Sequence, residues 1–375
     1  MSLSKKNKLF IGLMSGTSLD GVDVVLVDFK KPQPKLLGSY CHPISKTLKQ
    51  TLIKTIQPNW TGSLEDIGTL NKQLGELFSD ASLTFIKKEK IDPKLISAIG
   101  SHGQTLWHKP DGQYPFSLQL GDASMIAEKT GITTVADFRS RDISADGQGA
   151  PLAPAFHHAF LSHPVKNRMI LNIGGIANIT FLPKQSSNNS ISGFDTGPGN
   201  GLIDAWIKAN IKKRFDKNGD WARSGKILPD ILKILLSDDY FAKLAPKSTG
   251  KEAFNLTWLK QQLGNKLKSN IAEDIQATLT ELTAVSIANH IKNNCDELFI
   301  CGGGIHNQFL IERLQHHLPI TTSLSSTEEL GIHPDWMEAM AFAWLAKQTL
   351  EGKTSNLTEV TGAKGKRILG AIHQT

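Results

Sequence analysis

The fold is decided by a stretch near the N-terminus that reads Leu9-Phe-Ile-Gly-Leu-Met-Ser-Gly-Thr-Ser-Leu-Asp-Gly-Val-Asp-Val-Val-Leu-Val-Asp-Phe29. Two apolar runs of strand length flank a polar segment that is rich in glycine and hydroxyl side chains. Glycine lets backbone amides approach a phosphate group closely, and hydroxyl groups can donate to its oxygens. The stretch therefore predicts a phosphate-binding loop between two strands, with an ordinary β-hairpin turn as the alternative.

The same loop supplies candidate ligands for a nucleotide and for a metal ion. Asp20 and Asp23 could hold a hydrated Mg²⁺ ion, which prefers a few carboxylates and several water molecules. Which of the two contacts the ion is left open. The candidate nucleotide-binding residues of this loop are Gly16, Thr17, Ser18, Leu19, Asp20, Gly21, Val22 and Asp23.

The second half of the chain repeats this plan. Apolar runs at residues 168–173 and 177–182 flank a glycine turn, which predicts a second hairpin. A later strand at residues 297–301 ends in three glycines before a helix. Ligands in open α/β sheets bind at the carboxyl ends of strands, and helix N-termini attract phosphate. With plain glycine turns as the alternative, the candidate nucleotide-binding residues here are Asn172, Gly174, Gly175, Asn178, Gly197, Gly199, Gly302, Gly303 and Gly304.

Periodicity predicts the remaining elements. Helices are expected at residues 46–57, 64–90, 153–161, 271–293, 307–318 and 334–350, and strands at 36–44, 95–101 and 131–136. Ser63 and Asp66 give an N-cap signal for the second of these helices.

Asp195 is the candidate catalytic base. It ends a predicted strand, residues 191–195, and faces the glycine cluster Gly193-Phe-Asp-Thr-Gly-Pro-Gly-Asn-Gly201. A carboxylate at such a place can accept a proton from a substrate hydroxyl or from water, as the base does in phosphoryl transfer. The alternative is that Asp195 caps the following helix, but Asn200 is better placed for that.

Candidate substrate ligands lie in three other segments. His102, Gln104 and Thr105 follow a predicted buried strand and could bond a hydroxylated ligand, or form a plain polar loop. Arg139 or the nearby Arg141 could clamp a ligand carboxylate bidentately, and a surface salt bridge is the alternative for each. Glu338 lies amid apolar helix residues, which suggests a function, although an acidic residue near a helix N-terminus is favourable by itself.

Bulk properties limit the protein class. A chain of 375 residues with 39% hydrophobic and 21% charged residues predicts two globular domains, and its apolar runs are too short for a membrane span or a signal peptide. A cytoplasmic location is expected. The net charge of +7 comes from scattered lysines, so no nucleic acid partner is indicated.

The three cysteines have no C-x-x-C spacing, which argues against disulfides and zinc. P-loop and Rossmann fingerprints are absent from the sequence.

The order of these features carries a resemblance. Three glycine turns, placed hairpin, hairpin and strand-to-helix with an aspartate between the second and third, resemble the actin, sugar-kinase and heat-shock ATPase superfamily. The wording of the motifs is similar to that of the anhydro-N-acetylmuramic acid kinases, in Met14-Ser-Gly-Thr-Ser-Leu-Asp-Gly-Val-Asp23, Gly100-Ser-His-Gly-Gln-Thr105, Val135-Ala-Asp-Phe-Arg139, Gly147-Gln-Gly-Ala-Pro-Leu152, Leu171-Asn-Ile-Gly-Gly-Ile-Ala-Asn178, Phe194-Asp-Thr-Gly-Pro-Gly199 and Cys301-Gly-Gly-Gly304.

The resemblance implies an α/β, two-domain actin-like (ribonuclease-H-like) fold with a ligand cleft between the domains. Expected are a domain of residues 1–145, completed by about 351–375, and a second domain of residues 146–350. ATP and Mg²⁺ would be the cofactors. Water would open the bridge of 1,6-anhydro-N-acetylmuramic acid, and ATP would phosphorylate the released O6, in recycling of cell-wall peptidoglycan.

The resemblance also implies residue roles. Asp195 would deprotonate the water, Arg139 would hold the lactyl carboxylate, and Glu338 would help to orient the water or the sugar as a second catalytic residue. The sequence leaves open whether the chain forms a homodimer. Two alternatives to this function stay open, namely a simple amino-sugar kinase of the same fold and a non-catalytic actin-like ATPase.

Overall fold

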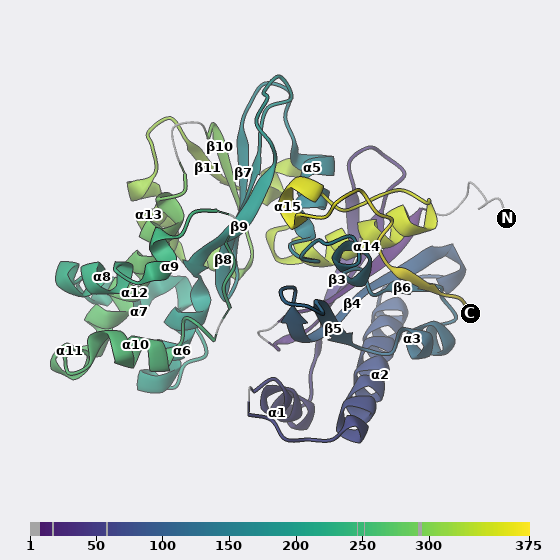
Figure 1. The fold of residues 1–375 in the computed structure, drawn as a ribbon, viewed down its shortest axis with the longest axis horizontal. Helices are drawn as coiled ribbons and strands as arrows, with labels where there is room; N and C mark the ends of the chain where they lie inside the picture. Colours follow the sequence, from purple (N-terminus) through teal and green to yellow (C-terminus); the bar gives the residue numbers. More distant parts are fainter. Residues whose placement is uncertain (1–7, 17–18, 58, 246, 251, 292–294) are drawn as a thin grey trace. The chain divides into compact units, whose positions relative to one another are not determined.

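The computed structural model describes residues 8–16, 19–57, 59–245, 247–250, 252–291 and 295–375. The chain divides into two compact units (Figure 1). The first combines Met1–Phe160 with Trp336–Thr375, and the second is Leu161–Asp335. These limits differ from the sequence-based expectation of 145/146 and about 350/351, because the helices α5 (Ala153–Leu161) and α14 (Met337–Leu350) are grouped with the first unit.

The described part of the first unit contains a seven-stranded sheet of order β12-β6-β4-β1-β2-β3, with β5 paired to β4. Strands β1, β2 and β3 form antiparallel hairpins, while β4 and β6 run parallel to β1 and to β4 respectively. The C-terminal strand β12 closes the order by pairing antiparallel to β6. The strands are β1 (Leu9–Ser15), β2 (Gly21–Asp28), β3 (Lys35–Pro43), β4 (Ile96–Lys109), β5 (Phe116–Leu120), β6 (Thr134–Ala136) and β12 (Ala371–His373).

Helices α2 and α14 cover opposite faces of this sheet, as the alternation of β1 shows. Ile11 and Leu13 join a buried cluster with Leu70, Leu74 and Phe78 of α2. The residue between them, Gly12, faces the other way, and a Cβ built on it would lie 1.9 Å from the carbonyl oxygen of Ala339 in α14. Because successive strand residues point to opposite faces, the two helices lie on opposite sides. The helices of this unit are α1 (Lys46–Thr55), α2 (Leu64–Lys88), α3 (Ala123–Thr130), α4 (Ser140–Ile143), α5, α14 and α15 (Thr358–Thr361).

The second unit has a five-stranded sheet of order β11-β10-β7-β8-β9 in its described residues. Its first three strands are again antiparallel hairpins, and β10 and β11 run parallel on the other side of β7. This is the same plan as β6-β4-β1-β2-β3, so the weak repeat in the sequence corresponds to a duplicated sheet topology. The predicted α/β actin-like architecture is confirmed. The strands are β7 (Arg168–Ile173), β8 (Ile176–Leu182), β9 (Ser192–Pro198), β10 (Glu297–Cys301) and β11 (Ser323–Ser326).

A helical layer extends the second unit. Helix α12, buried along most of its length, packs against α6, α7, α8 and α13. Its N-terminal half contributes Ile275, Leu279 and Leu282 to an apolar cluster with Trp206 and Trp258, and its C-terminal half packs under the sheet. The helices are α6 (Asn200–Ile211), α7 (Asp220–Ser224), α8 (Pro229–Leu236), α9 (Asp239–Ala242), α10 (Leu256–Leu263), α11 (Lys266–Ser269), α12 (Ala272–Ala288) and α13 (Gln308–His317). Among the helices of the described ranges, none is both long and apolar enough to cross a bilayer.

Of the predictions about helix ends, one is confirmed and two are wrong. Ser63 accepts from the amide of Asp66 while the Asp66 carboxylate accepts from the amide of Ser63, so the capping box at the start of α2 is confirmed. The prediction that Asn200 caps α6 is wrong, because Gly199 occupies the cap and the Asn200 amide group donates to the carbonyl of Ile173 (3.3 Å). The last long helix also begins later than predicted, at Met337.

Close approach of α14 to the sheet makes a first prediction. A Cβ on Gly100 in β4 would lie 2.1 Å from the carbonyl oxygen of Phe342, a backbone atom that cannot rotate away. Gly100→Ala should therefore lower the free energy of unfolding by about 3 kcal/mol, measured by urea denaturation. The matched control is Gly68→Ala in α2, where a Cβ meets no atom within 4 Å. This control should raise stability by about 0.5–1 kcal/mol. Equal stability of the two variants would contradict the packing described.

Candidate active site

The connection between β1 and β2 is held by contacts on both sides. The buried hydroxyl of Ser15 donates to the Gln104 side-chain oxygen (2.7 Å) and lies 3.3 Å from the carbonyl oxygen of Gly21. Lys49 donates to the carbonyl of Leu19 (2.6 Å), and Leu19 itself has a φ of 53°, which is uncommon for a branched side chain. Such backbone strain gathers at ligand-binding loops. The predicted ligands Thr17 and Ser18 lie outside the described residues.

The two candidate metal ligands differ in their surroundings. Asp20 is exposed and its carboxylate lies 3.6 Å from the Lys49 ammonium. Asp23 is half-buried within β2, in register with Met14 and Cys41. Within the described ranges, no three His, Cys, Asp or Glu side chains gather as a protein-only metal site. The two carboxylates of Asp20 and Asp23 are donors of the kind that Mg²⁺ takes, because this ion is commonly held by one or two carboxylates together with substrate phosphates and water.

Arg139 is fixed by a pair of neutral acceptors. It precedes the short helix α4, and its Nε and Nη2 donate to Nε2 of His102 at 3.2 and 2.8 Å. Its Nη1 donates to the carbonyl of Gly149 (2.7 Å). Burial and the neighbouring guanidinium lower the pKa of His102 well below its usual value, so the ring is neutral and Nε2 can accept. Burial also lowers the pKa of Arg139 to about 10, so it stays cationic at neutral pH.

The residues after the buried part of β4 do not form the polar loop that was one of the two alternatives, because β4 continues to Lys109 through its pairing with β5. Gln104 is buried, and its side-chain oxygen accepts a hydrogen bond from the Ser15 hydroxyl. The Thr105 hydroxyl accepts one from the Gln119 amide group (3.1 Å). His102 packs against Phe342 of α14, with ring centroids 4.6 Å apart and the ring planes tilted by 42°. The structure thus joins His102 directly to Arg139, and joins Gln104 to the β1–β2 connection.

Glu338 lies in the first turn of α14, one turn before Phe342 on the same side of the helix. Its side chain is accessible to solvent, yet the surrounding protein raises the pKa of its carboxyl, and the charge of Arg139 acts in the opposite direction. The electrostatic coupling makes Glu338 a neighbour of the His102–Arg139 pair. The alternative candidate Arg141 is exposed.

The glycine segments of the second unit pack backbone against backbone. The amides of Gly199 and Gly201 donate to the Gly175 carbonyl at 3.0 and 3.1 Å, and the Asn200 amide donates to Gly174 (2.8 Å). A Cβ on Gly199 would lie 2.4 Å from the Gly174 oxygen. The start of α6 therefore uses its glycines for close packing, and these amides are already engaged within the protein.

The triple glycine after β10 joins the same region. Gly302 has a φ of 79°, and a Cβ there would lie 2.2 Å from the Asn172 side-chain oxygen. Gly304 is equally close to the Ile173 side chain. The structure hence brings together three of the predicted segments, residues 172–175, 197–201 and 302–304. Asn178 lies opposite Asp195 in the pairing of β8 with β9.

Asp195 lies inside β9 rather than at its end, since the strand continues to Pro198. Its carboxylate accepts from the amide of Thr249 (2.9 Å). Burial raises the pKa of the Asp195 carboxyl to about 6, and the Thr249 hydrogen bond only partly opposes this. A carboxylate with such a pKa is ionised at neutral pH and is a stronger base than an ordinary aspartate.

Sequence reasoning missed the residues that hold Asp195. Its amide donates to the Lys247 carbonyl (3.0 Å), and its carbonyl accepts from the Tyr240 hydroxyl (2.8 Å). Burial raises the pKa of that hydroxyl, and the Asp195 charge adds to the rise, so Tyr240 stays protonated as a donor. Ser15 and Lys49 were likewise missed. Lys49, Tyr240 and Lys247 belong to none of the quoted motifs. Ser15 lies inside the Met14–Asp23 motif, but its partner Gln104 is far away in sequence.

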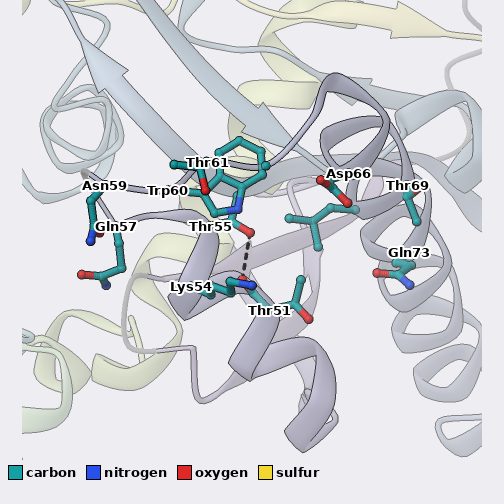
Figure 2. Close-up of a pocket in the computed structure, with 12 residues that line it drawn as sticks. Thr51, Lys54, Thr55, Gln57, Asn59, Trp60, Thr61, Asp66, Thr69 and Gln73 are labelled. Atoms are coloured by element: carbon teal, nitrogen blue, oxygen red, sulfur yellow. Dashed lines mark hydrogen bonds between the residues drawn. The ribbon is translucent and has the colours of Figure 1, made fainter.

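A pocket of about 530 Å³ lies apart from these residues, between α1 and α2 (Figure 2). Its only acidic lining group, Asp66, is already engaged in the capping box with Ser63. None of the predicted site residues that the structure describes lines this pocket, and we do not assign it to the candidate active site. It is lined by Thr51, Lys54, Thr55, Gln57, Asn59, Trp60, Thr61, Gly62, Asp66, Thr69, Leu70 and Gln73.

Comparison with known proteins identifies the family. The family model described as anhydro-N-acetylmuramic acid kinase matches residues 8–375. The chain is 50% identical to an anhydro-N-acetylmuramic acid kinase of Coxiella burnetii (strain Dugway 5J108-111) over 370 residues, which cover 97% of each chain. It is 48% identical to that of Saccharophagus degradans over 373 residues, covering 98% of this chain and 99% of the relative. Among solved structures, an activator of 2-hydroxyisocaproyl-CoA dehydratase from Clostridium difficile matches with a TM-score of 0.47 and 11% identity, over 93% of this chain and 99% of that one. The chain belongs to the anhydro-N-acetylmuramic acid kinase family.

Proposed function

We propose that the protein opens 1,6-anhydro-N-acetylmuramic acid with water and transfers the γ-phosphoryl group of ATP to the released O6. The products are N-acetylmuramic acid 6-phosphate and ADP. The observation that carries the chemical part of the proposal is the Asp195 carboxyl, whose pKa of about 6 suits a general base. Family membership supports the choice of substrate. The proposed setting is the cytoplasmic recycling of cell-wall fragments, where ATP is at hand.

In this proposal Asp195 accepts a proton from water while the water oxygen bonds to C1 of the sugar. The C1–O6 bond breaks as it does in inverting glycoside hydrolysis, and the electron pair stays on O6. O6 then bonds to the γ-phosphorus, and the bond to the β-phosphate oxygen of ATP breaks. Phosphoryl transfer of this kind depends mainly on positioning and on neutralising charge. Since O6 leaves towards phosphorus, it needs no separate proton donor.

The other predicted residues have binding roles in this proposal. Arg139 binds the lactyl carboxylate of the sugar, and Glu338, coupled electrostatically to Arg139, orients the water or the sugar. The loop from Gly16 to Asp23 and the glycine segments of the second unit border the nucleotide. Asp20 and Asp23 would hold Mg²⁺, which when bound neutralises charge on the phosphates. Because the Gly199 amide is engaged within the protein, Gly199 would shape the turn through close backbone packing and not donate to the nucleotide itself.

The reaction type can be tested with isotopes. The protein is incubated with Mg-ATP and the anhydro sugar in ¹⁸O-water, and the product is analysed by mass spectrometry. We expect a 6-phosphorylated sugar with heavy oxygen at C1, because water is the nucleophile. A phosphorylated product that keeps the anhydro bridge, or ADP release that does not depend on the sugar, would reject the proposal in favour of a simple kinase or a non-catalytic ATPase.

Asp195→Asn should lower kcat by at least about two orders of magnitude, the usual contribution of a positioned base, while ATP binding persists. In the unmodified protein, kcat/KM for the sugar should rise with pH up to about 6 and then level, because only the ionised carboxylate accepts a proton. Steady-state kinetics from pH 5 to pH 8 provides the measurement. A variant with near-normal turnover would exclude Asp195 as the base.

The effect of Asp195→Asn on thermal stability should depend on pH. The pKa of the Asp195 carboxyl rises from 3.8 to about 6 on folding, so the folded state binds the proton more tightly than the unfolded chain does. Ionised Asp195 therefore destabilises the fold above about pH 6, and this cost disappears as the pH falls towards 4. Asp195→Asn should raise the Tm at pH 8 and give little gain at pH 4.5, by differential scanning fluorimetry. A Tm difference that is independent of pH would show that the carboxyl is not perturbed.

Arg139→Lys should raise KM for the anhydro sugar about 10-fold to 100-fold, because lysine keeps the charge but loses the planar fork that binds a carboxylate bidentately. KM for ATP should change little. Arg141→Lys, two residues away and exposed, is the matched control and should behave like the unmodified protein. If the effect appeared in Arg141→Lys instead, the carboxylate would have to be assigned to Arg141.

A further inference from the structure

Asp142 is a fully buried carboxylate that the proposed reaction does not use. Its Oδ1 accepts from the Asn356 amide group (2.7 Å) and the Thr361 hydroxyl (2.8 Å), and its Oδ2 accepts from the Gly149 amide (2.8 Å). A buried charge is costly unless it is hydrogen-bonded, and here one donor from the following loop and two from the distant C-terminal segment converge on it. Asp142 therefore ties the loop that contains Gly149 to the C-terminal segment that contains Asn356 and Thr361.

Gly149 connects this carboxylate to Arg139. The Gly149 amide donates to Asp142 on one side, and the Gly149 carbonyl accepts from Arg139 Nη1 (2.7 Å) on the other. The turn between them is tight, because Gly149 has a φ of 66° and a Cβ on Gly147 would lie 2.3 Å from Asp142 Oδ2. The N–H and C=O of Gly149 belong to successive peptide groups that meet at its Cα, so the hydrogen bond to Asp142 anchors the tight turn whose next carbonyl contacts the guanidinium.

The C-terminal segment supports the same turn from behind. The Gln148 amide donates to the Thr361 carbonyl (2.8 Å), and the Lys364 amide donates to the Ala145 carbonyl (2.7 Å). Asn356, whose amide group binds Asp142, accepts in turn from the Arg367 amide (2.6 Å). Residues 356–367 thus form a backing for the loop of residues 142–149.

The remaining N–H donors of Arg139 indicate which kind of ligand group the guanidinium can bind. A guanidinium has five N–H donors, and the described residues use three of them, two on His102 and one on Gly149. Two donors are left, one on each terminal nitrogen, which is the number that a bidentate carboxylate contact requires. Because both neighbours of the guanidinium are fixed, its direction is fixed too.

We propose that Asp142 is a positioning residue that, through Gly149 and with Asn356 and Thr361 of the C-terminal segment, aims Arg139 at the carboxylate of the substrate. The proposal rests on the role assigned to Arg139 above and extends it. The C-terminal segment then contributes to substrate recognition without touching the substrate.

The test is a double-mutant cycle with Asp142→Asn and Arg139→Ala, read out as KM for the anhydro sugar and KM for ATP. Both Asp142 oxygens accept hydrogen bonds, so an asparagine amide group in either orientation faces a donor. We expect Asp142→Asn to raise the sugar KM about tenfold while the KM for ATP and kcat change less than about twofold. In the Arg139→Ala background the same change should add less than about twofold, because there is no guanidinium left to aim.

Two controls separate positioning from general damage. Asp146→Asn changes an exposed carboxylate of the same loop, which pairs with Lys364 at the surface (3.0 Å), and should have no effect. Thr361→Val removes one donor to Asp142 and should raise the sugar KM, while Thr361→Ser keeps the hydroxyl and should restore it. This threonine pair carries the test if Asp142→Asn fails to fold.

The outcomes distinguish this proposal from the proposed function. If the unmodified protein does not phosphorylate the anhydro sugar, or if Arg139→Ala leaves the sugar KM unchanged, the assigned function or the role of Arg139 fails, and the positioning role fails with it. If Arg139→Ala raises the sugar KM but Asp142→Asn matches Asp146→Asn, only the positioning role is overturned. Additive effects in the double variant would also overturn it.

Discussion

The structure depends on places where one backbone touches another with no side chain between them. In the first unit, Gly12 and Gly100 let α14 rest directly on β1 and β4, with a built Cβ only 1.9 and 2.1 Å from helix carbonyl oxygens. In the second unit, Gly199 and Gly201 let the start of α6 meet the turn between β7 and β8. Any larger residue would move a whole helix, because backbone atoms cannot change rotamer. These contacts set where the polar side chains of each unit lie.

The two clusters use opposite electrostatic strategies. Among the described residues, the Thr249 amide is the one donor to the Asp195 carboxylate, and burial dominates and raises its pKa to about 6. Asp142 receives three donors and remains a structural acceptor. Arg139 faces a neutral His102 instead of an acidic partner at hydrogen-bond distance, which keeps its charge available for an anionic ligand. Identical side-chain types thus take different tasks according to how many donors surround them.

Sequence analysis reached those features that are encoded locally. The hairpins around the glycine turns, the capping box of Ser63 and Asp66, and the α/β class follow from short-range patterns. Asp195 was predicted to be a catalytic base because it lies among glycines at the end of a predicted strand. For the stretch from His102 to Thr105, a polar loop was one of two alternatives, because the polarity of the stretch hides the fact that pairing with β5 extends β4. Ser15, Tyr240 and Asp142 could not be found, because their partners are far away in sequence and only the fold brings them close. The capping role predicted for Asn200 is wrong, because its side-chain amide donates a hydrogen bond to the carbonyl of Ile173, which is distant in sequence.

The way the chain passes between the units has a consequence for biosynthesis. The second unit is continuous, Leu161–Asp335, so all its described strands are synthesised before α14. The first unit begins earlier but waits for α14 and for β12, which pairs with β6. Domains generally fold as units during synthesis, usually from the N-terminal end. Here that order is inverted, because the unit that emerges first is the last to be completed. Until α14 is made, the face of the first sheet that this helix covers in the folded protein has no such cover.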